Sequence, residues 1–373
     1  MPAALKKWRF ALIGALISAV ALVFFLTQVD LAQFGDALRS ARFELILPVA
    51  GLILLGLAAR AARWRVLLGG GLTYRRCFHI LNVAYLANGI LPLRLGELAR
   101  AFLAARSPET GRIAQRSGRT VSHLQSVGHP HAATLPTHES GDPAASVPVL
   151  QSLSTVVVER LLDVLAVLVI LGLALGFAPL PDVLRASALL MLPLTVVGFA
   201  ALVILSSRRE QVLAQIERLA GRLKVAQRVN VAALAGHVFD GLAPLTQSKD
   251  MVMALVWTTI SWVFSVASGY VLMVAFFPQV GSIAATLLFT ASASFAVAVP
   301  AVPGNLGTYE ASVWVGLAAM GYGEPLATAT AFAVTIHGLN LLINAILGGI
   351  GLYAERLSLG ELSQGVQALN VYK

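Results

Sequence analysis

Cysteine and charged residues are both scarce in this sequence. Cys77 is the single cysteine, which excludes an intramolecular disulfide and a cysteine-based zinc cluster, so helix packing must hold the fold together. Only 12% of the 373 residues are charged and 57% are hydrophobic, whereas a soluble domain is about a quarter charged. The composition therefore predicts an all-α protein that crosses a membrane several times.

Motifs of common enzymes and of nucleotide-driven pumps are missing as well. The sequence has no G-x4-G-K-[ST] loop, no G-x-S-x-G and no H-E-x-x-H. His129 and His131 form an H-x-H pair, but no carboxylate at a fixed spacing accompanies them, so we expect no metal site. We therefore expect a protein that is not an enzyme and uses no cofactor. Without a nucleotide-binding loop, any transport by such a protein would be driven by a lipid gradient, by a coupled ion or by a partner.

Long apolar runs predict about six full transmembrane helices. The runs lie at residues 10–29, 45–65, 153–177, 187–205, 251–277 and 326–353. The net charge is +9, which in this composition points to membrane orientation and not to nucleic acid. With this topology the Lys and Arg residues lie on or near the cytoplasmic face, except Arg39, Arg42 and Arg185 outside and Arg160 in a span. This pattern predicts a multi-pass protein of the cytoplasmic (inner) membrane with both termini in the cytoplasm.

A polar segment at residues 107–149 interrupts the apolar sequence. It is rich in Ser, His, Pro, Gly and Thr and shows neither helical nor strand periodicity. Such a composition cannot bury enough apolar surface to offset the entropy of ordering, so we expect a disordered cytoplasmic loop. The domain organisation is then a single transmembrane domain at 1–353 that contains this loop, with a short cytoplasmic tail at 354–373.

Two short segments break apolar sequence with proline, glycine and charge. Residues 88–100 read N-G-I-L-P-L-R-L-G-E-L-A-R, and residues 303–310 read P-G-N-L-G-T-Y-E. Irregular backbone at membrane depth is tolerated only where it is packed in protein or lines a wet cavity. We interpret the segments as two opposed re-entrant hairpins, whose similar chemistry suggests an inverted repeat with broken helices meeting near the midplane. Two alternatives stay open: both breaks could be ordinary surface loops, and residues 282–320 could form two thin spans.

Charged and polar residues also lie inside or at the ends of the predicted spans. Arg60 and Arg63 share a helix face and could snorkel to lipid phosphates or bind substrate. Glu159, Arg160 and Asp163 stand three and four residues apart, which predicts a compensated cluster along one helix. His337, Asn340 and Asn344 form a polar stripe, which is typical of hydrogen bonds between helices. Residues 208–228 predict an amphipathic helix, either on the inner leaflet or packed on another cytoplasmic element.

Three of these stretches resemble one membrane family. The motifs are N-x3-P-x-R-x-G-E at 88–97 with Arg100 following, V-V-E-R-x2-D at 157–163, and P-G-x-L-G-x2-E at 303–310. Together they resemble the flippase-like family typified by the transmembrane half of lysyl-phosphatidylglycerol synthases, over nearly the whole chain except 107–149. In that family an aminoacyl-transfer domain often follows the membrane part. Here only residues 354–373 follow the last run, so the resemblance implies the lipid-translocating part and not the synthase chemistry.

The leading hypothesis is a flippase for a phospholipid or a lipid-linked anionic substrate, with membrane lipids as its partners. Arginine forks suit phosphate, and nearby carboxylates would compensate the charge. The expected substrate-binding residues are Arg63, Asn88, Arg94, Glu97, Arg100, Glu159, Arg160, Asp163, Asn305, Glu310, His337 and Asn340, and the expected breaks are at Pro92, Gly96, Pro303, Gly304 and Gly307.

Charge also predicts where these groups lie. Five ionisable groups left apart in hydrocarbon would each cost about 2.5–3.5 kcal/mol, so we expect Arg94, Glu97, Arg160, Asp163 and Glu310 to converge on one partly wet cavity.

Two alternatives to transport remain. One is an accessory subunit or enzyme of polyprenyl-phosphate or glycolipid metabolism, acting with a lipid-modifying or glycosyl-transfer enzyme. The other is a scaffold that recruits partners through the 107–149 loop.

Overall fold

The computed structural model describes residues 27–91, 95–106, 147–177, 207–222, 248–278, 281–298 and 303–371, with single positions at 23, 193, 196, 197, 200, 204 and 239. Every regular element in these ranges is a helix, so the predicted all-α class is confirmed for the part of the chain described. The predicted spans at 10–29 and 187–205, and most of the 107–149 segment, lie outside it.

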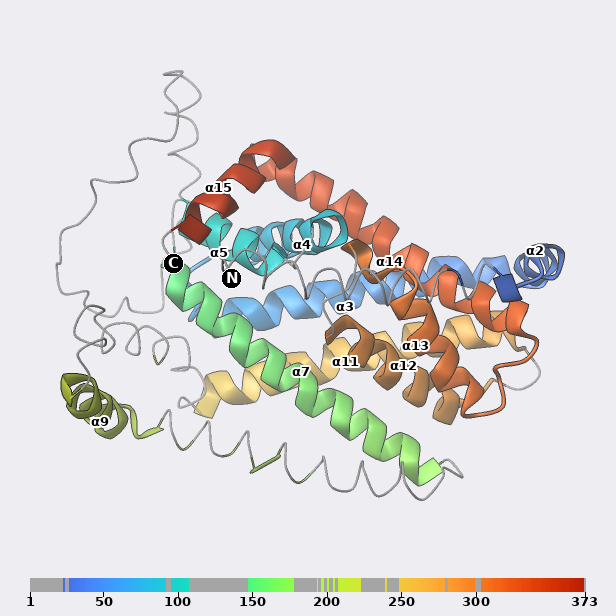
Figure 1. Ribbon diagram of the computed structural model, residues 1–373, viewed down its shortest axis with the longest axis horizontal. Coiled ribbons are helices and arrows are strands. Elements are labelled where there is room, and N and C mark those ends of the chain that lie inside the picture. The colour runs from blue at the N-terminus through green and yellow to red at the C-terminus, as the bar shows by residue number, and fades with distance from the viewer. Residues whose placement is uncertain are drawn as a thin grey trace, which may run out of the picture.

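The described part of the chain consists of helices (Figure 1). They are α2 (Leu31–Ser40), η1 (Phe43–Leu45), α3 (Ile46–Leu67), α4 (Tyr74–Ile90), α5 (Gly96–Ala105), α7 (Val149–Phe177), α9 (Arg209–Arg222), α11 (Ser248–Phe276), α12 (Ile283–Ala298), η5 (Pro303–Asn305), α13 (Thr308–Ala318), α14 (Leu326–Glu355) and α15 (Leu359–Val371). Helix α2 was predicted only as an external segment. Its start is set by Asp30, whose carboxylate accepts the N–H groups of Ala32 and Gln33.

Three helices are long and apolar enough to cross a membrane in the ranges described. They are Phe43–Leu67, Lys249–Phe276 and Leu326–Glu355, each within or around one of the predicted runs. Helix α7 has 29 residues, which at about 1.5 Å per residue exceeds a hydrocarbon core of about 30 Å. It carries three ionisable residues, Glu159, Arg160 and Asp163, which form ion pairs with α3 and α5. The chain is therefore a multi-pass membrane protein, and the total of six spans stays a prediction.

Close pairs of helices build the core. Helices α3 and α11 lie side by side, as do α4 and α14 (Figure 1). Glycine allows the second approach: a Cβ atom at Gly348 would lie 2.8 Å from the carbonyl oxygen of Asn82, and one at Gly351 would lie 2.7 Å from that of His79. Small residues that let backbones approach are the usual means of packing helices in lipid, where no hydrophobic force draws them together.

An ion pair fastens the same two helices about one turn beyond the contact of Gly351 with His79. Arg76 of α4 donates from Nε to Glu355 of α14 at 3.2 Å, and both side chains are buried. The Arg76 guanidinium also donates to the carbonyl oxygens of Leu103, at 3.1 Å, and of Arg106. The C-terminal end of α5 is thereby held against α4 and α14.

The two broken segments have the form of short helix pairs. Helix α4 has 17 residues and α5 has 10, while α12 has 16 and α13 has 11. Eleven residues extend only about 16 Å, roughly half of the hydrocarbon core. Helices α12 and α13 pack side by side, closely enough that a Cβ atom at Gly316 would lie 2.5 Å from the Cα of Phe289. These lengths favour hairpins over thin spans.

The two breaks touch each other, as the sequence predicted. Element η5 packs on α4, and a Cβ atom at Gly304 would lie 3.6 Å from the carbonyl oxygen of Gly89. Gly304 has φ 70°, in the left-handed region that favours glycine. The interpretation of the breaks as separate surface loops is therefore not supported by the packing.

One boundary differs from the prediction. Val147 is buried, and its N–H donates to the carbonyl oxygen of Ala104 at 2.8 Å. Residues 147–149 therefore belong to the packed domain and not to the loop.

The amphipathic helix predicted at residues 208–228 contains α9. Val212 and Leu213 of α9 pack against the apolar cluster that includes Leu67 and Leu162. This contact supports the alternative in which the helix packs on another element of the protein.

Candidate functional site

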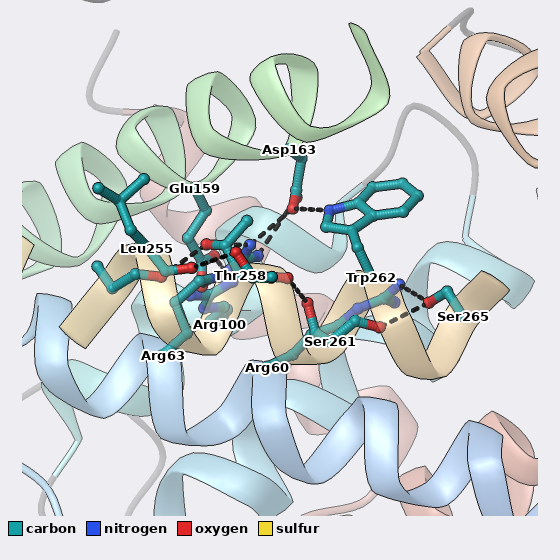
Figure 2. Close-up of polar contacts among 12 residues, drawn as sticks. Arg60, Arg63, Arg100, Glu159, Asp163, Leu255, Thr258, Ser261, Trp262 and Ser265 are labelled. Atoms are coloured by element: carbon teal, nitrogen blue, oxygen red, sulfur yellow. Dashed lines mark hydrogen bonds and ion pairs between the residues drawn. The ribbon is translucent and has the colours of Figure 1, made fainter. Parts of the chain in front are cut away.

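Arg63 is the buried centre of a network between three helices. It lies on α3 and is only 2% exposed. Its Nη1 lies 2.6 Å from Oδ1 of Asp163 on α7, and its Nη2 lies 3.3 Å from Oδ2, so the two side chains form a bidentate pair. Thr258 of α11 accepts from the same Nη1 at 3.3 Å, and Trp262 of α11 donates to Asp163 Oδ1 at 3.2 Å (Figure 2). The alternative that Arg63 snorkels to the surface is excluded by its burial.

Arg100 of α5 joins this network through Glu159 of α7. Its Nη1 lies 2.6 Å from Oε2 of Glu159, and the other oxygen of that carboxylate lies 3.6 Å from Nε of Arg63. The guanidinium of Arg100 also lies 4.0 Å above the ring of Trp64, in a cation–π contact. Glu159 therefore bridges two buried arginines from α3 and α5.

Two buried donors of this network, Nε and Nη2 of Arg100, have no hydrogen-bond acceptor among the described residues. Nε of Arg63 also makes no hydrogen bond there, but it faces Oε1 of Glu159 in their ion pair at 3.6 Å. A buried donor without an acceptor costs about 1–3 kcal/mol, and more when it is charged. A further acceptor beside Arg100 would remove this cost.

The Arg160–Glu97 pair forms the more exposed end of the network. Arg160 of α7 donates from Nη2 to Oε1 of Glu97 on α5 at 2.5 Å. The side chain of Arg160 is 49% exposed and that of Glu97 is 23% exposed, unlike the buried Arg63. An exposed ion pair is worth about 0–1 kcal/mol, so this pair can open at little cost.

Positive charge exceeds negative charge in this network. Arg60, one helical turn before Arg63 on the same face of α3, donates to Ser265 of α11 at 3.3 Å (Figure 2). With it, the network holds four arginines against three carboxylates. We name these seven residues the arginine cluster: Arg60, Arg63, Glu97, Arg100, Glu159, Arg160 and Asp163. Its excess of one positive charge suits a ligand with one negative charge.

The predicted pairing within α7 is corrected by these contacts. Glu159, Arg160 and Asp163 were expected to compensate one another along their helix. Their ion pairs instead go to Arg63, Arg100 and Glu97 on α3 and α5. The physical reason is that their three helices meet at this point, so each charge finds an opposite charge across an interface.

A second polar centre lies at the other break. Glu310 of α13 and His337 of α14 are both buried, with Oε1 of the carboxylate 2.6 Å from Nδ1 of the imidazole. The N–H of Gly307 donates to the other carboxylate oxygen at 2.7 Å. The ring of Tyr309 stacks on His337 with centroids 4.3 Å apart. His337 thus bonds between helices, as its polar stripe predicted, while Asn340 donates to the Ile336 carbonyl of its own helix.

Several predicted binding residues also shape the breaks, and their binding of substrate stays a prediction. Asn88 accepts the N–H of Gly96 at 2.8 Å, so it caps the start of α5. Gly96 has no room for a side chain, since a Cβ atom would lie 2.1 Å from the carbonyl oxygen of Ala84. Asn305 has φ 54°, and its carbonyl oxygen accepts from the hydroxyl of Thr308. Pro303 begins η5, while Pro92 and Arg94 lie outside the described residues.

The predicted convergence of five groups is met in part. Glu97 and Arg160 meet, and Asp163 lies in the same cluster, whereas Glu310 pairs with His337. The two centres are joined through the touching breaks at Gly89 and Gly304.

Sequence reasoning missed Trp64, Thr258, Trp262 and Tyr309. A tryptophan inside an apolar span, away from the interface where tryptophan is usual, was the signal available for Trp262, because its indole N–H needs a partner.

Groups of three or more His, Cys, Asp or Glu residues that could hold a metal ion are absent from the described ranges. That the protein uses no metal or cofactor stays a prediction.

A family model described as the lysylphosphatidylglycerol synthase TM region matches residues 11–120 and 128–348. The match confirms the resemblance drawn from the three motifs. It also extends it, because most of the 107–149 segment, which we expected to fall outside, lies within the matched residues and only 121–127 interrupts them. No curated protein and no solved structure matches the chain.

Proposed function

The chain belongs to the family of the lysylphosphatidylglycerol synthase TM region, and from this premise we propose that it moves a lipid with an anionic headgroup between the two leaflets. The family makes the chain a membrane protein related to lipid metabolism or transport. The arginine cluster supports the finer statement.

The observation that carries the proposal is the pair of buried donors on Arg100, Nε and Nη2, that have no acceptor among the described residues. With Arg60 counted, the cluster also has one positive charge in excess of its carboxylates. A phosphodiester carries one negative charge and offers two unesterified oxygens, which the planar guanidinium fork can bind with two hydrogen bonds. A headgroup with a net positive charge would add to the excess positive charge of the cluster.

The position of the Arg160–Glu97 pair supports a route to this site. The pair is part-exposed, whereas Arg100 and Glu159 behind it are buried. A headgroup that replaces Glu97 on Arg160 would gain a charge-assisted bond before it reaches Arg100. Glu97 follows Gly96 at the first break, so release of Glu97 would act on the broken helix pair.

Liposomes that contain fluorescently labelled phosphatidylglycerol test this proposal. The wild-type protein should make the inner-leaflet label accessible to an external quencher. Arg100→Gln removes one hydrogen bond to a charged group, about 1.5–3 kcal/mol, and should slow translocation roughly ten- to a hundredfold. Arg100→Lys keeps the charge without the planar guanidinium fork. Its translocation rate should lie between those of the wild type and Arg100→Gln.

The matched control is Arg39→Gln, because Arg39 is exposed on α2 and pairs only with its helical neighbour Asp36 in the contacts of that helix. It should translocate at the wild-type rate. A folded Arg100→Gln protein that also keeps the wild-type rate would refute the proposal.

A further inference from the structure

The contact between Glu310 and His337 lies apart from the arginine cluster. Both side chains are buried, their polar atoms lie 2.6 Å apart, and the carboxylate also holds the N–H of Gly307 at the break. Two ionisable side chains in direct contact inside a membrane domain are rare and mark functional positions.

The surroundings of the pair are poor in charge. Helix α12, which packs on α13, has no ionisable residue. Tyr85 of α4 lies in the same apolar cluster as Tyr309, and Arg60 of α3 interacts electrostatically with the Tyr309 hydroxyl.

The other ionisable groups on the packed elements bond elsewhere or do not touch the pair among the described contacts. Arg76 of α4 and Glu355 of α14 form their own ion pair, and Asp36 and Arg39 of α2 form another. Further ionisable residues of α4, α11 and α14 make no contact with the pair among the contacts described. They are His79, Tyr74 and Arg75 of α4, Tyr270, Lys249 and Asp250 of α11, and Tyr353 of α14. Glu310 and His337 are therefore each other's principal partners.

We propose that the Glu310–His337 pair is a proton-binding site through which proton movement is coupled to the movement of the anionic lipid. The inference rests on the proposed function and names its coupling ion. With the proton, the pair is an imidazolium beside a carboxylate and has no net charge. Without it, a neutral imidazole leaves one negative charge buried among apolar side chains, which low-dielectric surroundings oppose.

The bonds of Glu310 connect this change of charge to the site of the lipid. Glu310 holds Gly307, and in the same break Gly304 touches the carbonyl of Gly89. The neighbouring Asn88 caps Gly96, directly before Glu97. Loss of the proton would loosen the Glu310 contacts and thereby move the break that carries Glu97. One proton moving with one monoanionic lipid is electroneutral.

A pH gradient across liposomes with labelled phosphatidylglycerol tests the inference. For one proton per lipid, a gradient of one pH unit should shift the label tenfold toward the leaflet that faces the more alkaline solution. A potential imposed with potassium and valinomycin should leave the leaflet ratio unchanged. A pH dye inside the liposomes should report proton movement when a lipid gradient is imposed at equal pH.

Two variants and one control complete the test. Glu310→Gln and His337→Gln should both abolish the pH-driven shift, and His337→Gln keeps a hydrogen-bond donor for Glu310 if the other variant fails to fold. Asp36→Asn removes an exposed carboxylate on α2 and should keep the tenfold shift. Translocation by the wild type that ignores the pH gradient would overturn the proton site and leave the proposed function standing. A wild type that moves no labelled lipid would overturn both.

Discussion

Replacing Arg63 by alanine should destabilise the protein more than any other substitution in the arginine cluster. Arg63 is 2% exposed and holds Asp163 by two hydrogen bonds while it lies against Glu159. Its removal leaves the part-buried carboxylate of Asp163 with Trp262 as its remaining hydrogen-bond partner, and the buried Glu159 with Arg100, among the described residues. Breaking a buried ion pair from one side costs about 3–5 kcal/mol. Arg160→Ala breaks a part-exposed pair instead, worth about 0–1 kcal/mol.

Melting of the detergent-solubilised protein separates these two variants. At roughly 2 °C per kcal/mol for a large domain, Arg63→Ala should lower the melting temperature by about 6–10 °C and Arg160→Ala by no more than about 2 °C. Adding Asp163→Asn to Arg63→Ala removes the stranded charge and should recover part of the loss. Equal losses of melting temperature for Arg63→Ala and Arg160→Ala would refute the assignment of Arg63 to the buried end and Arg160 to the exposed end of the arginine cluster.

Three further predictions concern the break, the topology and the loop. Gly96→Ala should cost about 1–3 kcal/mol, because its Cβ would overlap the backbone of α4, and should show as a lower melting temperature; an unchanged value would contradict this packing. In a Cys77→Ala background, a cysteine at Asp182 should be labelled from outside and one at Thr120 only after permeabilisation, and the reverse would overturn the topology. Replacing residues 107–146 by a short Gly/Ser linker should leave the melting temperature within a few degrees, whereas loss of expression would show that the segment packs on the domain.

The free-energy cost of an unpaired charge in hydrocarbon made part of the site predictable from sequence. Charged residues inside apolar runs must be paired, so the participation of Glu97, Arg160 and Asp163 in buried or part-buried pairs followed from their position alone. The touching of the two breaks followed from the same reasoning about irregular backbone.

The partners were not predictable, because they depend on how helices are set against one another. Spacing along one helix favoured Arg160 with Asp163, whereas the contact with Glu97 requires α5 to lie on α7. The role of Asn88 was open for a similar reason: an amide can cap a helix or bind a headgroup, and only the position of Gly96 decides between them.

Native mass spectrometry of the gently purified protein tests the central claim most directly. The account predicts a co-purified lipid whose headgroup has one net negative charge, and loss of that lipid in Arg100→Gln but not in Arg39→Gln. A bound nucleotide sugar, or a lipid with a positively charged headgroup retained by both variants, would contradict it.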